Sequence, residues 1–298
     1  MKKIGFLSLL VAGAFAACSE TDDSANRPAE EQQAQERLIT VEVSENPLTD
    51  EATGAPVFGT TRAVATTTAT LTAFSMNYTG SYKYDFTKTG DTWSTNSWPG
   101  VGPTTKIDFY AYTGGTFNYN SGNPYVSFTA DENASTQHDL LVATHKEIAY
   151  NDASGHVSLS FDHACAAVQF NIGQSQTLKG QSVTYTSIAL VGIYNSGIYY
   201  YNSTPSPSWS DLSGDATYTM ESATSIDIPV STTTHEGARA LSCGNLFMIP
   251  QAHSNAKIRI EYKKGGDAKT TADIPLTIDW KAGYLYTINI RLGTSIIK

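Results

Sequence analysis

The sequence has few charged residues, few cysteines and no basic stretch. Charged residues make up 16% of its 298 residues, and the net charge is −9 at pH 7. Binding to nucleic acid is excluded, because it depends on a surface rich in Lys and Arg. The low charge also excludes a coiled coil.

Motifs for catalysis and cofactor binding are missing as well. The sequence contains no G-x-S-x-G, no P-loop and no G-x-G-x-x-G, and none of its six histidines has another at i+2 or i+4. We therefore expect no enzyme, no metal site and no cofactor. The one catalytic alternative is a carboxylate pair for glycoside hydrolysis, although no two carboxylates stand out among Asp108, Asp162, Glu221 and Asp279.

Residue types that favour strands and turns are abundant instead, with 17 Tyr, 11 Phe, 23 Gly and many Thr and Ser. Short alternating stretches bounded by turn residues predict strands at 38–43, 69–74, 106–112, 140–143, 157–161, 166–172, 185–191, 246–249, 257–262, 273–278 and 284–292. Residues 44–62 carry loop residues and are expected to contain no strand. The series predicts an all-β protein built from packed antiparallel sheets.

Two blocks of predicted strands are separated by the turn-rich sequence NDASG at residues 151–155. We expect a first β-sandwich domain over residues 38–154 and a second over residues 155–298. Both lengths are ordinary for a domain.

The N-terminus has the layout of an export signal. Residues 1–17, MKKIGFLSLLVAGAFAA, combine two lysines with an apolar stretch too short to span a bilayer. The sequence FAAC resembles a bacterial lipobox, which predicts that Cys18 is lipidated and becomes the first mature residue. An ordinary signal peptide followed by a chance cysteine is the alternative.

The segment after Cys18 is acidic. Its run SETDDS resembles the signal that sends lipoproteins to the outer face of the outer membrane in Gram-negative anaerobes, although a plain solvated tether is also consistent with it. Residues 19–37 are expected to be disordered. Over residues 19–62 three arginines (Arg27, Arg37 and Arg62) accompany a larger set of acids: Glu20, Asp22, Asp23, Glu30, Glu31, Glu36, Glu42, Glu45, Asp50 and Glu51.

Two further features allow two interpretations each. Cys165 and Cys243 are small core residues or, in an exported protein, a disulfide. The aromatic run at 193–211 is either a platform on which Tyr199, Tyr200, Tyr201 and Trp209 contact a sugar, or a β-hairpin with its turn at YNSG (194–197). In the hairpin the tyrosines of the following strand alternate into half-buried positions. The hairpin is the favoured interpretation.

Several segments, read in order, resemble the fimbrillin family, the subunits of type V pili and related surface lipoproteins. Besides the lipobox at Cys18, they are GTTRA (59–63), WPGVGPTTKIDFYAY (98–112), HDLLVA (138–143), VSLSFDHACAAVQFNI (157–172), LFMIPQ (246–251) and WKAGYLYTINIRL (280–292). They run through most of the mature chain. The resemblance implies two transthyretin-like β-sandwich domains in tandem, on the cell surface.

The resemblance also implies a mode of assembly. A protease cuts the lipoprotein precursor after an arginine, which matches Arg62 here, although Arg27 and Arg37 also lie in sequence that a protease would accept. The first strand then departs, and a strand from a neighbouring subunit takes its place. The matching removable strand consists of Leu38, Ile39, Thr40, Val41, Glu42 and Val43.

Two functions from different classes follow. The first is a structural subunit or adhesin of a type V pilus, whose partners are other subunits and a host or glycan ligand. Only six residues follow the last predicted strand, about 20 Å when extended, and this favours a tip or accessory subunit. The alternative is a monomeric surface lipoprotein that binds glycans through the aromatics at 193–211.

Overall fold

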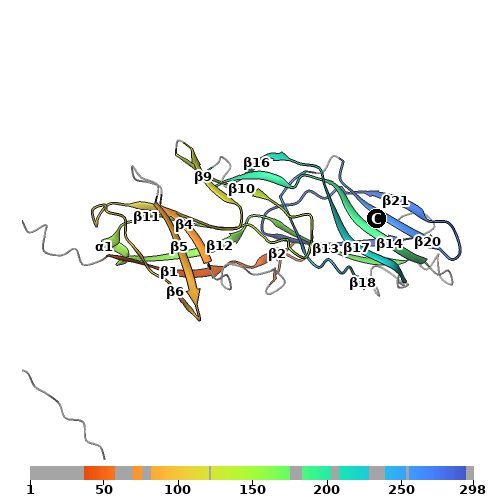
Figure 1. Ribbon diagram of the computed structural model, residues 1–298, viewed down its shortest axis with the longest axis horizontal. Coiled ribbons are helices and arrows are strands. Elements are labelled where there is room, and N and C mark those ends of the chain that lie inside the picture. The colour runs from red at the N-terminus through yellow and green to blue at the C-terminus, as the bar shows by residue number, and fades with distance from the viewer. Residues whose placement is uncertain are drawn as a thin grey trace, which may run out of the picture. The chain divides into compact units, whose positions relative to one another are not determined.

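The computed structural model describes residues 37–57, 70–75, 82–120, 122–174, 183–202, 208–227, 239–252 and 255–292 (Figure 1). Within these ranges nearly all regular structure is β, and one four-residue helix is present, α1 (Tyr150–Ala153). The predicted all-β fold is therefore confirmed. No helix in these ranges is long and apolar enough to cross a membrane.

The first sheet has eight strands in the order β6–β5–β4–β8–β11–β12–β1–β7. β1 runs parallel to β12, whereas β12, β11, β8 and β4 pair in antiparallel fashion. One face packs on a core that includes Ile39, Phe86, Phe109 and Phe161. The strands are β1 (Leu38–Glu45), β4 (Thr70–Ser75), β5 (Tyr82–Thr89), β6 (Thr92–Trp93), β7 (Asn96–Ser97), β8 (Ile107–Thr113), β11 (Leu141–Ile148) and β12 (His156–His163).

A small four-stranded sheet, β16–β15–β10–β9, packs beside the first. A second core joins its buried residues, such as Val126 and Tyr201, to Tyr110 of the first sheet and to Leu48 and Phe247. Its strands are β9 (Thr116–Asn120), β10 (Asn123–Thr129), β15 (Ser196–Tyr200) and β16 (Ser208–Ser213).

The remaining strands form two sheets around a third core. One has the order β18–β13–β22–β2–β3, with β19 also paired to β13, and the other has the order β17–β14–β20–β21. Phe170, Tyr185, Tyr218 and Ile260 are among the buried residues between them. The strands are β2 (Leu48–Asp50), β3 (Pro56–Val57), β13 (Ala166–Gln174), β14 (Val183–Ile193), β17 (Ala216–Asp227), β18 (Arg239–Ala240), β19 (Leu246–Met248), β20 (Lys257–Lys264), β21 (Thr270–Pro275) and β22 (Tyr284–Leu292).

Four pairings cross the expected domain boundary at residues 151–155. β12 follows the boundary in sequence but pairs with β1 and β11, β15 pairs with β10, and β22 pairs with β2. The contacts group residues 37–298 into one compact unit. A division into tandem domains at residues 154 and 155 stays a prediction.

The interpretation of residues 44–62 as strand-free was wrong, because β2 and β3 lie there. These strands have three and two residues. Their only fully buried side chain is that of Leu48, so no alternation is long enough to reveal them. β2 nevertheless joins the six-stranded sheet beside β22.

We expect Leu48→Ala to lower the free energy of unfolding by about 2–5 kcal/mol, because it leaves a cavity in a packed core. Leu48 is fully buried, whereas Leu38, ten residues earlier in the same segment, is 37% exposed. The matched control Leu38→Ala should therefore cost about 0.5 kcal/mol or less. Urea unfolding of the two variants measures the difference, and equal losses would contradict the placement of Leu48.

Candidate strand-binding groove

Residues 37–57, the N-terminal segment hereafter, pair with strands of both larger sheets. β1 lies beside β12 from Thr40↔His156 to Glu45↔Phe161. The chain then passes to the six-stranded sheet, where β2 pairs with the start of β22 at Thr49↔Tyr284. Figure 1 shows β1 and β2 following one another along these sheets. The strand predicted at residues 38–43 is present and extends to Glu45.

Apolar side chains of the N-terminal segment complete two of the cores. Ile39 is fully buried, and Val41 and Val43 pack against the same core from half-buried positions. Leu48 is fully buried in the second core, beside residues such as Phe247. Removal of the segment would expose this apolar surface to water, together with the backbone groups of β12.

Between β1 and β2 the segment makes a polar corner. The side-chain Nδ2 of Asn46 donates to Asp162 Oδ1 at 2.6 Å, and its backbone N donates to Phe161 O at 2.8 Å. Ser160 Oγ in turn donates to Asn46 Oδ1 at 3.2 Å. These bonds fix the position at which the chain leaves β12.

The corner also holds a buried charged cluster. Glu45 Oε1 lies 3.6 Å from Nε2 of His163, and Nδ1 of the same ring lies 2.6 Å from Asp139 Oδ2. The side chains of His163, Asp139 and Glu45 are 2%, 1% and 10% exposed. Burial alone would lower the pKa of His163, but the hydrogen bond with Asp139 and the charges of Asp139 and Glu45 raise it above its ordinary value.

Sequence reasoning did not single out this cluster. The available signal was Glu45, an acid at an inward position of the alternation that otherwise places Ile39, Val41 and Val43 on the core face. His163 and Asp139 lie 24 residues apart, and no sequence pattern links them.

The edge of β22 stays open beyond its pairing with β2. β2 pairs only with Tyr284 and Leu285, because the chain turns after Asp50 and returns as β3. The turn is closed by the Asp50 carboxylate, which accepts bonds from the backbone N and the hydroxyl of Thr53. No other strand in the part of the chain that the structure describes pairs with this side of β22.

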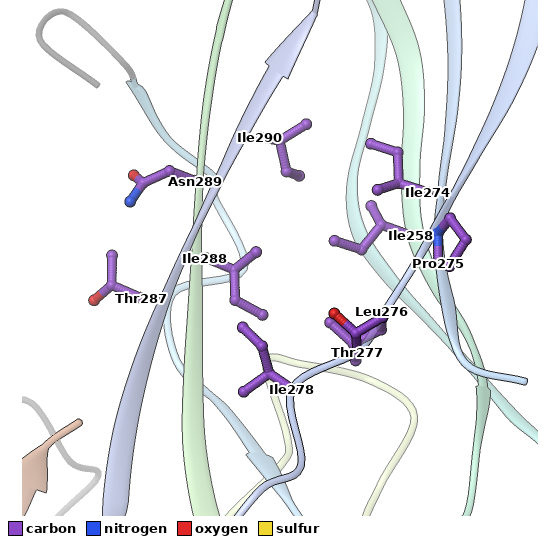
Figure 2. Close-up of a pocket in the computed structure, with 10 residues that line it drawn as sticks. All are labelled: Ile258, Ile274, Pro275, Leu276, Thr277, Ile278, Thr287, Ile288, Asn289 and Ile290. Carbon is purple, nitrogen blue, oxygen red and sulfur yellow. The ribbon is translucent and has the colours of Figure 1, made fainter. Parts of the chain in front are cut away.

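An apolar groove of about 310 Å³ lies between the open edge of β22 and β21. Figure 2 shows Ile288 and Ile290 pointing from β22 into the groove, while Thr287 and Asn289 point to the other side of the strand. There they hydrogen-bond to side chains of β13. Ile278, on the rim, is 43% exposed. The groove thus combines apolar side chains with the unpaired edge of a strand.

Comparisons with known proteins identify the family. The model of a family described as fimbrillin-like matches residues 45–298. The chain belongs to the fimbrillin-like family. The resemblance seen in the sequence is therefore confirmed.

Solved structures share the fold of this fimbrillin-like chain. A fimbrial protein from Bacteroides vulgatus is 17% identical, with 86% of this chain and 95% of that chain covered and a TM-score of 0.59. A candidate cell adhesion protein from Bacteroides eggerthii is 15% identical, with coverages of 87% and 86% and a TM-score of 0.54. Another from Parabacteroides distasonis is 11% identical, with coverages of 87% and 89% and a TM-score of 0.52. None of the curated proteins is similar enough to match.

The aromatic run of this fimbrillin-like chain contains a hairpin, but not around the expected turn at residues 194–197, because β15 pairs with β10 and β16 and not with the preceding β14. β15 and β16 pair with Tyr199 opposite Trp209. Tyr199 and Tyr201 are each 5% exposed, so they are core residues and cannot form the sugar platform considered from the sequence. Tyr201 donates to Ala111 O at 2.8 Å. Tyr200 and Trp209 are half-buried, and Nε1 of Trp209 donates to Ala164 O at 2.7 Å.

Other residues singled out from the sequence are placed as follows. Cys18 and Arg62 lie outside the described residues. Cys165 and Cys243 are not joined in a disulfide, and burial raises the pKa of the Cys165 thiol. Of the four carboxylates considered for glycoside hydrolysis, Asp108 lies on β8, Asp162 on β12, Glu221 on β17 and Asp279 on the loop before β22.

We expect the free energy of unfolding to fall as the pH rises above about 6.5, the ordinary pKa of a histidine. A histidine whose pKa is raised by folding stabilises the folded state fully below its unfolded pKa, near 6.5, and this stabilisation is lost as the pH rises through the folded pKa. Urea unfolding at a series of pH values measures the fall.

The fall should be smaller in His163→Gln, which removes the titrating group. The matched control is His156→Gln, because His156 also faces an acid of β1, Glu42, but its side chain is 52% exposed. This control should keep the pH dependence of the unmodified chain. An unchanged pH dependence in His163→Gln would contradict the assignment.

Proposed function

We propose that this protein is a cell-surface fimbrial subunit that assembles by strand exchange. The precursor is exported as a lipoprotein held by Cys18 at the outer membrane, and a protease cuts it after Arg62. The N-terminal segment then leaves, and a strand of a neighbouring subunit takes its place beside β12 and β22. A tip or accessory position in the fimbria is part of the proposal.

The pairing of the N-terminal segment is the observation that carries the proposal. The segment precedes the proposed cut and is joined to β12 and β22 by backbone bonds and buried side chains. When such a segment leaves, a strand edge and an apolar groove remain, and an added strand satisfies both. The N-terminal segment is therefore suited to replacement by a strand from a neighbouring subunit.

The open edge of β22 supports the same proposal. β2 occupies only the start of this edge, and the groove with Ile288 and Ile290 continues beyond it. A longer strand in the place of β2 would pair with more of β22 and cover Ile288 and Ile278, whose side chains are half-buried and exposed, respectively. An incoming strand can therefore bury apolar surface that the original segment leaves exposed.

Charge also favours assembly after the cut. Residues 19–62 contain ten of the 28 acidic residues of the chain and three of its 19 basic residues. Cleavage removes this excess of negative charge, and less charged subunits repel one another less.

We expect Arg62→Ala to abolish polymerisation while leaving the fold intact, because the N-terminal segment stays covalently attached. Electron microscopy of cell-surface material and N-terminal sequencing check this outcome, and assembled subunits should begin at Ala63. Arg37→Ala is the matched control, since Arg37 is the nearest preceding arginine. Fibres formed by Arg62→Ala at the normal level would show that the maturation scheme is wrong.

We expect Ile278→Asp to reduce fibre assembly at least tenfold by placing a charge on the rim of the groove, where an incoming strand would bury it. Tyr119→Asp is the matched control, because Tyr119 on β9 is equally exposed, at 43%. Each substitution should change the unfolding free energy by about 0.5 kcal/mol or less. Equal assembly of the two variants would contradict the use of this groove.

A second candidate function is glycan binding by a monomeric lipoprotein. It rests on a pocket of about 350 Å³ lined by Trp209, Tyr284, Asp162 and Thr49, where aromatic and polar side chains meet. Surface protein that begins at Cys18 and binds sugars on a glycan array would favour this function over assembly.

A further inference from the structure

The buried end of β12 carries His163, whose ring is held in an orientation that suits a negatively charged partner. His163 is 2% exposed, and its Nδ1 is held by Asp139, which also accepts a bond from the backbone N of Cys165 at 3.3 Å. The ring is therefore fixed by groups outside the N-terminal segment. Its Nε2 faces Glu45 Oε1 at 3.6 Å and lies near the backbone of Asn46, and both of these residues belong to the N-terminal segment.

Glu45 is the one member of this cluster that belongs to the replaceable segment. It follows Ile39, Val41 and Val43 on the inward side of β1, and its side chain is 10% exposed. An acid at an inward position costs free energy unless it meets a cation or a hydrogen-bond donor, and Nε2 of His163 is the group that it meets.

From this geometry we propose that His163 and Asp139 form a carboxylate-binding subsite, and that any strand which replaces β1 must carry an Asp or Glu in the position of Glu45. The second half of this inference rests on the proposed function. The partner strand then has apolar residues at the positions of Ile39, Val41 and Val43, an acid at the fourth inward position, and an apolar residue for the site of Leu48.

The requirement follows from what His163 would otherwise face. A strand with an apolar or neutral residue at this position leaves the buried N–H of His163 without its charged acceptor. The free-energy cost of this is large compared with the cost of losing an ion pair at the surface. β22, the last strand within the described residues, contains no acidic residue. A second copy of the chain that donated β22 would therefore be a poorer occupant than a strand with the acid.

The same two strands provide a matched control. Glu42 also faces a histidine of β12, His156, at 3.3 Å, but these side chains are 71% and 52% exposed. An exposed pair of this kind contributes little. Glu42→Gln and Glu45→Gln are thus the same chemical change three residues apart. The first removes a charge from the solvent-exposed face of β1, and the second removes one from the buried corner.

The first experiment measures hydrogen exchange of the β1 backbone amides in the full chain at about pH 6, where His163 is protonated. Glu45→Gln should speed exchange about tenfold, and Glu42→Gln should change it less than about twofold. Exchange in the double variant Glu45→Gln with His163→Gln should be faster than in the unmodified chain by less than the two single effects combined, because both substitutions remove the same interaction. Equal rates for Glu45→Gln and Glu42→Gln would overturn the subsite, whether or not the protein assembles.

The second experiment tests the partner. A synthetic peptide with the sequence of residues 38–50 is offered to the full chain after cleavage following Arg62, and release of the cut segment is followed by mass spectrometry. The Glu45→Gln peptide should release the same fraction of the cut segment only at an about tenfold higher concentration. The Glu42→Gln peptide should need a concentration less than about twofold higher.

Equal potency of the Glu45→Gln and unmodified peptides would overturn the requirement on the partner strand. If no peptide releases the segment, strand replacement fails, and the partner requirement fails with it. The exchange rates in the full chain still decide the subsite in that case, so the two failures are distinguishable.

Discussion

Two strands of the body, β12 and β22, each need a neighbour on one side, and residues 38–50 supply it for both. Backbone hydrogen bonds account for one part of this need, and apolar side chains account for the other, because Ile39 and Leu48 complete separate cores. The arrangement of the first and the six-stranded sheets therefore depends on a short segment near the N-terminus. The same dependence makes the segment a natural point of exchange in a member of the fimbrillin-like family.

Within this interface, the apolar contacts and the charged corner have different effects. Ile39, Val41 and Leu48 bury surface and favour almost any strand of suitable shape. A buried charged cluster adds little net stability, because desolvation offsets most of the attraction, but a mismatched partner costs much more. Glu45, His163 and Asp139 therefore act mainly on which strand fits and in which register.

The elements predicted best were those with a long regular alternation. β22 begins and ends where the sequence pattern placed it, at Tyr284 and Leu292, and β1 differs by two residues at one end. β2 was missed because three residues carry no pattern. The pairing of β12 with β1 could not be predicted, because alternation shows which face is buried and not which strand is the neighbour. The charged corner brings together residues from three separate segments, and the burial of Tyr199 and Tyr201 is likewise a property of tertiary packing.

The parallel pairing of β1 with β12 has a consequence for synthesis. Thr40 and His156 are 116 positions apart, so the ribosome completes β1 long before its partner exists. Contacts this distant form slowly, because a large loop must close before any pairing repays the lost entropy. For that interval the nascent chain carries an unpaired apolar strand, which is a site of misassembly. The acidic residues just before it give neighbouring nascent chains a mutual repulsion during this interval.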